Sequence, residues 1–358
     1  MAGLRSAEAH SYKRAQRGFG KGGAQQRNVT KMILVTGGAG FIGSNLVAAL
    51  AERGEAVVVC DRLGQGDKWR NLAHHDLEDV IPPEELPDFL RWAEGRLKAV
   101  FHLGAISATT ESDGDALMAN NFRLSKVFWD HCAQEEIPLI YASSAATYGA
   151  GAEGFDDDAS RDYLAGLRPL NGYGWSKHLF DRWVMRRLAM EAPAPSQWAG
   201  LKFFNVYGPN EYHKGGQASV AWHLYGQLSR GEPAKLFQSH HPDYPDGGQL
   251  RDFIWVGDCV DVMLWLLDNS AVNGLFNVGT GKARSFVDLA RAVFAAMERP
   301  ENIRYVPTPE AIREKYQYFT EARMARLRAA GYDKPFTDLE AGVARYVKDF
   351  LVKPDPYR

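Results

Sequence analysis

The stretch that decides the fold reads MILVTGGAGFIG and spans residues 32–43. Ile33–Thr36 is a short apolar run typical of a buried strand, and glycines follow it at positions 37, 40 and 43. Gly37 permits a tight turn, Gly40 lets the backbone approach a pyrophosphate, and Gly43 allows a helix to pack closely on the strand. The N-terminus of that helix supplies N–H donors and the positive end of a dipole. The stretch therefore predicts a dinucleotide-binding turn between a strand and a helix.

Segments beyond this turn alternate between strand-like and helix-like patterns. Ser44–Arg53 has apolar residues on one helical face and ends before Gly54, and Ala56–Cys60 is a second apolar strand. The alternation continues with strands expected at Ala99–Leu103, Leu139–Ser143, Leu201–Val206 and Phe276–Val278, and with helices at Ala116–Glu135 and Gly174–Met190. This order predicts an α/β fold with a Rossmann-type doubly wound parallel sheet. Two loop-rich stretches, 156–170 and 240–250, are expected to overhang the C-terminal edge of the sheet, where ligands bind in such folds.

Three parts are expected along the chain. Residues 1–31 form a flexible basic tail with seven Lys or Arg and one Glu, which is either native or lies upstream of a natural start at Met32. Residues 32–205, with a return segment at about 252–280, form a dinucleotide-binding Rossmann domain. Residues 206–251 and 281–358 form a smaller C-terminal substrate-binding domain. Because the chain carries −2 overall and the tail +6, the rest carries −8, which gives no electrostatic footprint for nucleic acid.

Composition excludes several classes of protein. The 358-residue chain is 45% hydrophobic and 24% charged, as in ordinary globular proteins, which excludes a mainly disordered chain. No apolar run approaches the roughly 20 residues of a membrane-spanning helix, so no membrane insertion is expected. Cys60, Cys132 and Cys259 lie far apart, which argues against disulfides and a metal site and fits a cytoplasmic protein.

The type of dinucleotide depends on Asp61 and Arg62, which end the second expected strand. A carboxylate at this position accepts hydrogen bonds from a ribose 2′-hydroxyl and favours NAD. Arg62, with Lys68 behind it, can instead pair with the 2′-phosphate of NADP. The two signals conflict, and the residues tilt only slightly towards NADP over NAD.

A second group of residues is typical of proton transfer. Tyr173 and Lys177 are four residues apart on an expected helix and share one face, so the ammonium can lie beside the phenol and lower its pKa. Ser143 and Ser144 end a preceding strand, where a hydroxyl can bind the same substrate oxygen. The alternative, a surface Tyr and Lys pair without a catalytic role, is disfavoured by the glycine turn in the same chain.

Together with the glycine turn, these residues resemble the extended short-chain dehydrogenase/reductase superfamily over residues 32–350. The run FNVYGP at 204–209 is similar to nucleotide-sugar epimerases and dehydratases. A hexose dehydratase would carry an Asp-Glu pair after the strand serines, whereas this chain reads SSAATY at 143–148. Further runs are HKG at 213–215, ASVAWH at 218–223, RDF at 251–253, YQ at 316–317 and AAGYDKPF at 329–336. These resemble the ADP-L-glycero-D-manno-heptose 6-epimerase family.

This resemblance implies epimerisation at C6″ of ADP-D-glycero-β-D-manno-heptose to its L-glycero epimer, a step that supplies the lipopolysaccharide inner core. Tightly bound NADP takes hydride from C6″ and returns it to the other face of a transient ketone. The resemblance implies that Tyr173 handles the hydroxyl proton of one epimer and Lys214 that of the other. It also implies that Ser144 hydrogen-bonds to the reacting region of the substrate and that Lys177 supports Tyr173. The alternative that Lys214 only binds a phosphate group, or is an ordinary surface lysine, stays open.

The resemblance also implies two sets of binding residues and no metal. The cofactor-binding set is Gly37, Gly40, Phe41, Ile42, Gly43, Asp61, Arg62, Lys68, Leu103, Gly104, Ala105, Ile106, Ser107, Asn120, Lys177, Val206 and Lys214. The substrate-binding set is Asn205, Gly216, His223, Phe237, Gln238, Ser239, His240, Arg251 and Tyr316. The chain departs from the family pattern at Pro83, Leu103 and Gly216, and its 240–250 loop is longer than usual. His223 fits a buried or surface histidine as well as it fits a ligand.

The expected partners are an ADP-heptose substrate and further copies of the chain in a homo-oligomer. Two other functions remain open. A UDP-hexose 4-epimerase would share Ser144, Tyr173 and Lys177 but would not need Lys214. A non-catalytic dinucleotide-binding protein could also use this fold, although such proteins often lack the Tyr and Lys pair.

Overall fold

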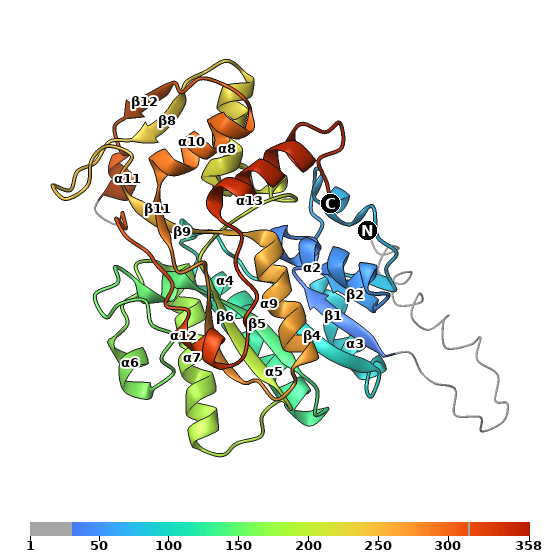
Figure 1. Ribbon diagram of the computed structural model, residues 1–358. Helices are drawn as coiled ribbons and strands as arrows, with labels where there is room; N and C mark the ends of the chain where they lie inside the picture. Colours follow the sequence, from blue (N-terminus) through green and yellow to red (C-terminus); the bar gives the residue numbers. More distant parts are fainter. Residues whose placement is uncertain (1–30, 314–315) are drawn as a thin grey trace, which may run out of the picture. The chain divides into compact units, whose positions relative to one another are not determined.

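The computed structural model describes residues 31–313 and 316–358, which Figure 1 traces by sequence. The expectation of a flexible tail falls almost wholly on residues 1–30, outside the described part of the chain. Residues 31–358 form one compact unit. The expected boundaries between a dinucleotide-binding and a substrate-binding domain within that unit therefore stay a prediction.

The central element is a seven-stranded sheet in which every neighbouring pair runs parallel. In spatial order its strands are β10 (Gly274–Val278), β6 (Trp198–Phe203), β5 (Leu139–Ser144), β4 (Leu97–His102), β1 (Met32–Thr36), β2 (Ala56–Cys60) and β3 (Asp79–Ile81). From β3 through β1 to β6 this is the strand order of the Rossmann fold. The predicted fold class is confirmed.

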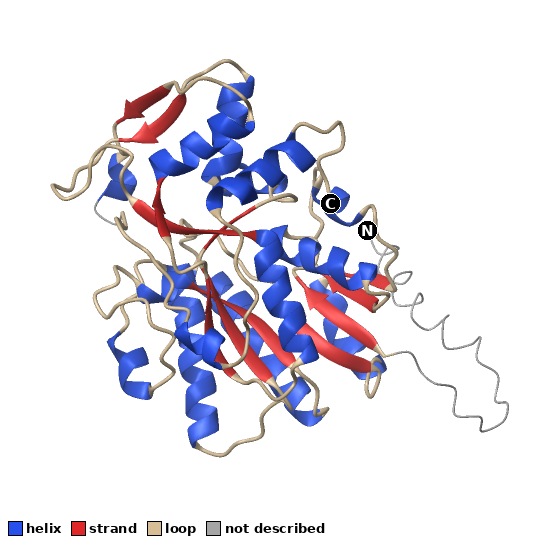
Figure 2. Ribbon diagram, in the orientation of Figure 1, coloured by secondary structure: helices blue, strands red, loops and turns tan. Residues whose placement is uncertain are grey.

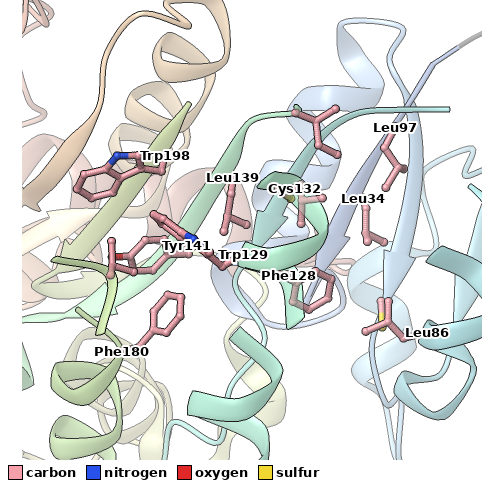
Figure 3. Close-up of a cluster of buried hydrophobic side chains, with 14 of the residues drawn as sticks. Leu34, Leu86, Leu97, Phe128, Trp129, Cys132, Leu139, Tyr141, Phe180 and Trp198 are labelled. Carbon is pink, nitrogen blue, oxygen red and sulfur yellow. The ribbon is translucent and has the colours of Figure 1, made fainter. Parts of the chain in front are cut away.

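Helices cover both faces of this sheet, as Figure 2 shows by colour. Alternate β1 residues face opposite ways: Leu34 packs in one apolar cluster, while Ile33 and Val35 pack in another. The first cluster includes Phe128 and Trp129 and is drawn in Figure 3. Because both faces are buried, these strands read as continuous apolar runs rather than as an alternating pattern.

The helices flanking the sheet are α2 (Phe41–Glu52), α3 (Leu86–Trp92), α4 (Gly114–Leu117), α5 (Leu124–Gln134), α6 (Arg161–Gly166), α7 (Gly172–Ala189), α9 (Val256–Asp268) and α12 (Ala325–Ala329). Short helical turns are η2 (Lys68–Leu72), η3 (Pro83–Glu85), η4 (Met118–Arg123) and η5 (Ala145–Tyr148). The predicted helix at Ala116–Glu135 is thus helical throughout but contains η4, a π-helical turn. None of the helices within the described ranges is long and apolar enough to span a membrane.

A third apolar cluster lies outside the large sheet, around the elements in the upper part of Figure 1. The helices and turns in this part of the molecule are η6 (Tyr212–Gln217), α8 (Val220–Ser229), α10 (Phe286–Ala296), α11 (Glu310–Arg313), α13 (Leu339–Arg345) and η7 (Tyr346–Leu351). The strands in the same part are β7 (Asn205–Tyr207), β9 (Leu250–Trp255) and β11 (Ala283–Ser285), which form one sheet, and β8 (Ala234–Phe237) and β12 (Ile303–Val306), which form another.

One expected strand is wrong in its extent. The run 201–206 was predicted as a single strand, but β6 ends at Phe203 and β7 begins at Asn205 in a different sheet. The amide of Phe204 still bonds Val278 of β10, and the Val206 amide then bonds the Phe204 carbonyl, so the chain turns at this point. The turn carries Asn205 from the edge of the large sheet into the small one. The run alone cannot indicate such a change of sheet, because the partner of β7 is β9, a distant segment of the chain.

Candidate functional site

The glycine turn joins β1 to α2 and is too crowded for side chains. Gly37 has a φ of +66°, and a Cβ there would lie 2.6 Å from the Gly104 amide nitrogen. A Cβ on Gly43 would lie 2.1 Å from the Gly37 carbonyl oxygen. Real Cβ atoms do not approach backbone this closely, so both positions require glycine. Helix α2 begins at Phe41, directly after Gly40, and leaves its first N–H groups facing outward from the turn.

At the end of β2, Asp61 and Lys68 are already paired. The Asp61 carboxylate accepts a bond from the Ala39 amide at 3.0 Å and one from the Lys68 ammonium at 2.7 Å. Arg62 pairs instead with Glu84 on η3, and both side chains are exposed. Asp61 and Lys68 line the central cleft, and Arg62 does not. Of the two expected cations, Lys68 is therefore the one that faces the cleft.

A cleft of about 970 Å³ runs from the glycine turn to α8 and α10. It is lined by eighteen of the residues expected at the site: Gly37, Gly40, Phe41, Ile42, Gly43, Asp61, Lys68, Leu103, Gly104, Ala105, Ser107, Ser144, Tyr173, Lys177, Asn205, Val206, Lys214 and Gly216. Its volume is at the upper end of the usual range for small-molecule sites, which suits two ligands side by side. The structure therefore brings the four expected proton-transfer residues and most of the expected cofactor-binding set into one space, but only Asn205 and Gly216 of the expected substrate-binding set.

Ten expected site residues are not among those lining this cleft: Arg62, Ile106, Asn120, His223, Phe237, Gln238, Ser239, His240, Arg251 and Tyr316. Asn120 bonds the Ala116 carbonyl of its own helix. Its neighbour Asn121 instead holds the Leu103–Ser107 loop, since its amide bonds both the N–H and the carbonyl of Ile106. His223 lies against the Trp222 ring, 5.0 Å between ring centres.

Arg251 and Tyr316 lie beside the cleft rather than in its wall. The Arg251 guanidinium is buried between the rings of Tyr316 and Phe286, at 5.3 and 5.7 Å from their centres, and Phe286 does line the cleft. Burial lowers the pKa of Arg251. The Phe237 ring lies 6.2 Å from Tyr316, so part of the expected substrate set gathers around one buried cation. A buried cation of this kind suits an anionic ligand group.

The expected proton-transfer residues meet at the N-terminus of α7. Asn171 caps this helix by accepting the Gly174 amide, and the Ser144 hydroxyl hydrogen-bonds Tyr173. Burial raises the pKa of Tyr173, and the Ser144 bond opposes that rise. The net shift of the Tyr173 pKa in the protein is therefore upward, because loss of hydration outweighs the other influences on the phenol, and the expected lowering by Lys177 stays a prediction.

Lys177 is buried on the same face of α7. Burial lowers its pKa to about 8, while the nearby Asp181 carboxylate acts in the opposite direction. Its charge is also felt by His102 on β4, whose pKa burial and Lys177 together lower to about 3. The pKa of Lys177 thus lies well below that of an exposed lysine.

Lys214 approaches the cleft from the opposite side, on η6. Its ammonium lies 5.3 Å from the centre of the Phe41 ring. Burial lowers the pKa of Lys214, and Glu211 raises it in part. Gly215, with a φ of +53°, turns the chain immediately after it. A group with a lowered pKa in a cleft is suited to acid–base work.

Sequence reasoning missed several residues of the cleft wall. These are Thr109, Thr110, Ala142, Phe203, Phe204, Tyr207, His213, Gln217, Ala218, Ser219, Val220, Ala221, Phe253, Phe286 and Leu289. Several of them lie in the quoted runs FNVYGP, HKG, ASVAWH and RDF, and these runs were the available signal. Within the ranges that the structure describes, no group of three or more His, Cys, Asp or Glu residues could hold a metal ion.

Comparison with known proteins identifies the family. The chain matches the NAD dependent epimerase/dehydratase family over residues 33–279. It is 50% identical to the ADP-L-glycero-D-manno-heptose-6-epimerase of Nitratidesulfovibrio vulgaris strain DP4 over 91% of this chain and all of that one. The chain belongs to the ADP-L-glycero-D-manno-heptose-6-epimerase family. A Fusobacterium nucleatum member is 46% identical over the same shares.

A solved structure agrees with this membership. The ADP-L-glycero-D-manno-heptose-6-epimerase of Helicobacter pylori superposes with a TM-score of 0.72 and 26% identity, covering 91% of this chain and 98% of that one. The sequence resemblance to this epimerase family is thus confirmed. The expectation that the chain is an epimerase that uses a nicotinamide dinucleotide is confirmed as well. The roles of individual site residues stay predictions.

Proposed function

We propose that this epimerase converts ADP-D-glycero-β-D-manno-heptose to its L-glycero epimer at C6″, with NADP held through the cycle. The observation that carries the proposal is that Tyr173 and Lys214, from separate elements, line one cleft that also contains the glycine turn. The names of two relatives, which match 91% of this chain over their own full length, support this choice of substrate. The product is a precursor of the lipopolysaccharide inner core.

The residues present fit a dinucleotide. The cradle at Gly37 and Gly43 leaves backbone open where any Cβ would clash, and α2 presents its N-terminus there. Lys68 is the cation placed to favour a 2′-phosphate, because it lines the cleft beside Asp61 and can offset the charge of that carboxylate. Bound there, the dinucleotide would supply reversible oxidation of the C6″ alcohol.

The chain's own residues would move the proton of the C6″ hydroxyl. Epimers present this hydroxyl on opposite faces, so two proton-handling groups are needed. In the proposal Tyr173 serves one epimer, with Ser144 bonding the same oxygen, and Lys214 serves the other. Lys177 would stabilise the phenolate of Tyr173 by its charge. Arg251 would pair with the diphosphate of the sugar nucleotide.

The test uses purified protein with no added cofactor and follows the C6″ configuration of ADP-D-glycero-β-D-manno-heptose by NMR. Denaturation then releases the dinucleotide for identification. Formation of the L-glycero epimer together with released NADP supports the proposal. Release of NAD would contradict the proposal that the cofactor is NADP. Turnover of UDP-galactose with no conversion of the ADP-heptose would favour a UDP-hexose 4-epimerase.

Two further properties belong to this proposal. Cys60, Cys132 and Cys259 are free and buried, which is compatible with the reducing cytoplasm where we place the enzyme. The family resemblance supports assembly into a homo-oligomer. Size-exclusion chromatography with light scattering tests that assembly, and a mass of about 40 kDa in solution would contradict it.

A further inference from the structure

Beneath the proton-transfer residues lies a fully buried ion pair. Asp181 is on α7, two helical turns after Tyr173 and one after Lys177, and Lys202 is on β6. The Lys202 ammonium lies 2.6 Å from Asp181, and neither side chain is exposed to solvent. Removing two charges from water costs more free energy than an average ion pair returns. A pair retained at that cost calls for a role beyond stability.

The carboxylate of Asp181 joins three elements. It accepts the Ser143 hydroxyl at 2.8 Å and the Tyr141 hydroxyl at 3.3 Å, both from β5, and Lys202 from β6. Ser143 and Lys202 are register partners across the two strands. One carboxylate thus fixes α7 against the two strands whose C-terminal ends lead to the cleft.

Lys202 extends this connection to Ser144. Its ammonium also donates to the Thr147 hydroxyl at 2.9 Å, and that hydroxyl donates to the Ser144 carbonyl at 2.8 Å. The Ser144 hydroxyl in turn accepts the Ala146 amide. A Cβ on Gly174 would lie 2.6 Å from the Ala146 carbonyl, so the start of α7 already packs tightly on this turn.

We propose that the Asp181–Lys202 pair is the positioning unit of the proton-transfer residues. It holds Ser144 in reach of Tyr173 by tying η5 to α7, and it places a negative charge one helical turn below Lys177. Neither residue lines the cleft, so both act through others. This inference rests on the proposed roles of Tyr173 and Lys177.

The electrostatic part of the proposal has a definite sign. Lys177 is influenced by Asp181 on its own helix, and it faces His102 on β4, which is neutral at ordinary pH because its pKa is about 3. Asp181 is therefore the charge that raises the pKa of Lys177 against the effect of its burial. Loss of the Asp181 charge would lower the pKa of Lys177 further, and the enzyme would lose its cation at a lower pH.

Two variants test the pair in the full chain. Asp181→Asn removes the negative charge but leaves the Lys202 ammonium buried without a charged partner, which can prevent folding. Asp181→Asn combined with Lys202→Met removes both charges and keeps an acceptor for Ser143, so it keeps the test valid if the single variant does not fold. Asp258→Asn is the matched control, since Asp258 is a buried carboxylate that bonds Thr337 away from the cleft.

Three readouts separate positioning from a merely structural role. We expect kcat to fall roughly tenfold or more with KM changed less than about twofold, a loss within the range of general acid–base catalysis. The basic limb of the kcat–pH profile should move to lower pH. Competitive acetylation of Lys177, read by mass spectrometry against pH, should show the same displacement without any turnover, whereas Asp258→Asn should show neither.

The double variant decides the outcome. If it recovers the melting temperature of the unmodified protein but keeps the displaced Lys177 midpoint and the low kcat, the pair positions and charges the site. If its Lys177 midpoint and its kcat equal those of the unmodified protein, the pair is only structural and the inference fails. Should the unmodified protein not turn over ADP-heptose, the proposed function fails while the acetylation midpoint still tests the inference.

Discussion

The ammonium of Lys214 lies 5.3 Å from the centre of the Phe41 ring, and Phe41 is the first residue of the helix that follows the glycine turn. A side chain from η6 thus reaches over the N-terminus of α2, the element expected to bind the dinucleotide. Glu211 holds this arrangement, because its buried carboxylate accepts the hydroxyls of Ser219 and Tyr346 while its carbonyl accepts the Lys214 amide. Lys214 is therefore held in the wall of the cleft that also contains the glycine turn.

This placement leads to the first prediction. Lys214→Met should spare NADP binding and lower kcat for epimerisation by roughly 10²- to 10⁴-fold, the usual contribution of a general acid or base. Retained dinucleotide is measured after denaturation, and turnover is followed by NMR of C6″.

The control for Lys214 is Lys235→Met, since Lys235 is an exposed cation paired with Glu232. It should leave turnover unchanged. A near-normal kcat in Lys214→Met would contradict the assignment of Lys214 as the second proton-handling group and leave it as a phosphate or surface lysine.

Lys68 and Arg62 should differ in their effect on cofactor choice. Lys68→Met removes a cation that lines the cleft, so NADP affinity should fall by about tenfold or more while NAD affinity changes little, as expected for a charge-assisted bond. Arg62→Met should change NADP affinity much less, because Arg62 is exposed and pairs with Glu84. Calorimetric titration of both dinucleotides measures the difference. Equal losses in the two variants would contradict the role given to Lys68.

Much of this architecture follows from the sequence alone. The strand–glycine–helix run at residues 32–43 predicted β1, the turn and α2, since tight backbone contact leaves glycine as the sole choice at Gly37 and Gly43. The Tyr173 and Lys177 spacing predicted one helix face because i and i+4 positions coincide on any helix. Local rules suffice for these features.

The rest depends on contacts between distant segments, which no local pattern encodes. The break between β6 and β7 follows from pairing of β7 with β9, which lies some fifty residues later. The upward direction of the Tyr173 pKa follows from burial in the folded cleft. Asn121 rather than Asn120 holds the Leu103–Ser107 loop, because η4 packs on α7 with Asn121 bonded to both Ile106 and Ser176.

Glycine substitutions should separate the cradle from other turns. Gly43→Ala should abolish dinucleotide retention, because the added Cβ would lie 2.1 Å from a backbone oxygen that cannot give way. Gly114→Ala has open space and begins α4, so it should be neutral or stabilise the fold by about 0.4–1 kcal/mol. Released dinucleotide and melting temperature are the measurements. Full retention of dinucleotide by Gly43→Ala would contradict a cradle at this position.

His102 should make the protein sensitive to acid. The imidazole is buried between Thr36 and Ser125, at 2.7 and 2.9 Å. The Ser125 hydroxyl donates to the Asn121 carbonyl, so it accepts from the imidazole Nε2–H, and Thr36 donates to Nδ1. The network thus requires a neutral ring. Burial, with a smaller contribution from Lys177, lowers the pKa of His102 to about 3.

The sign of the effect follows from the lowered folded pKa. An unfolded histidine titrates near 6.5, so the stabilising contribution is complete above that pH and is lost as the pH falls from about 6.5 towards 3. At pH 4.5 this loss amounts to about 3 kcal/mol, since two units separate that pH from 6.5.

His102→Gln stays neutral at every pH, so it should be less stable than the parent at pH 7 but should lose less stability on acidification. Urea unfolding at pH 7 and 4.5 measures the difference, with the exposed His74→Gln as the control. Parallel losses of stability in His102→Gln and the parent would show that protonation of His102 does not drive acid unfolding.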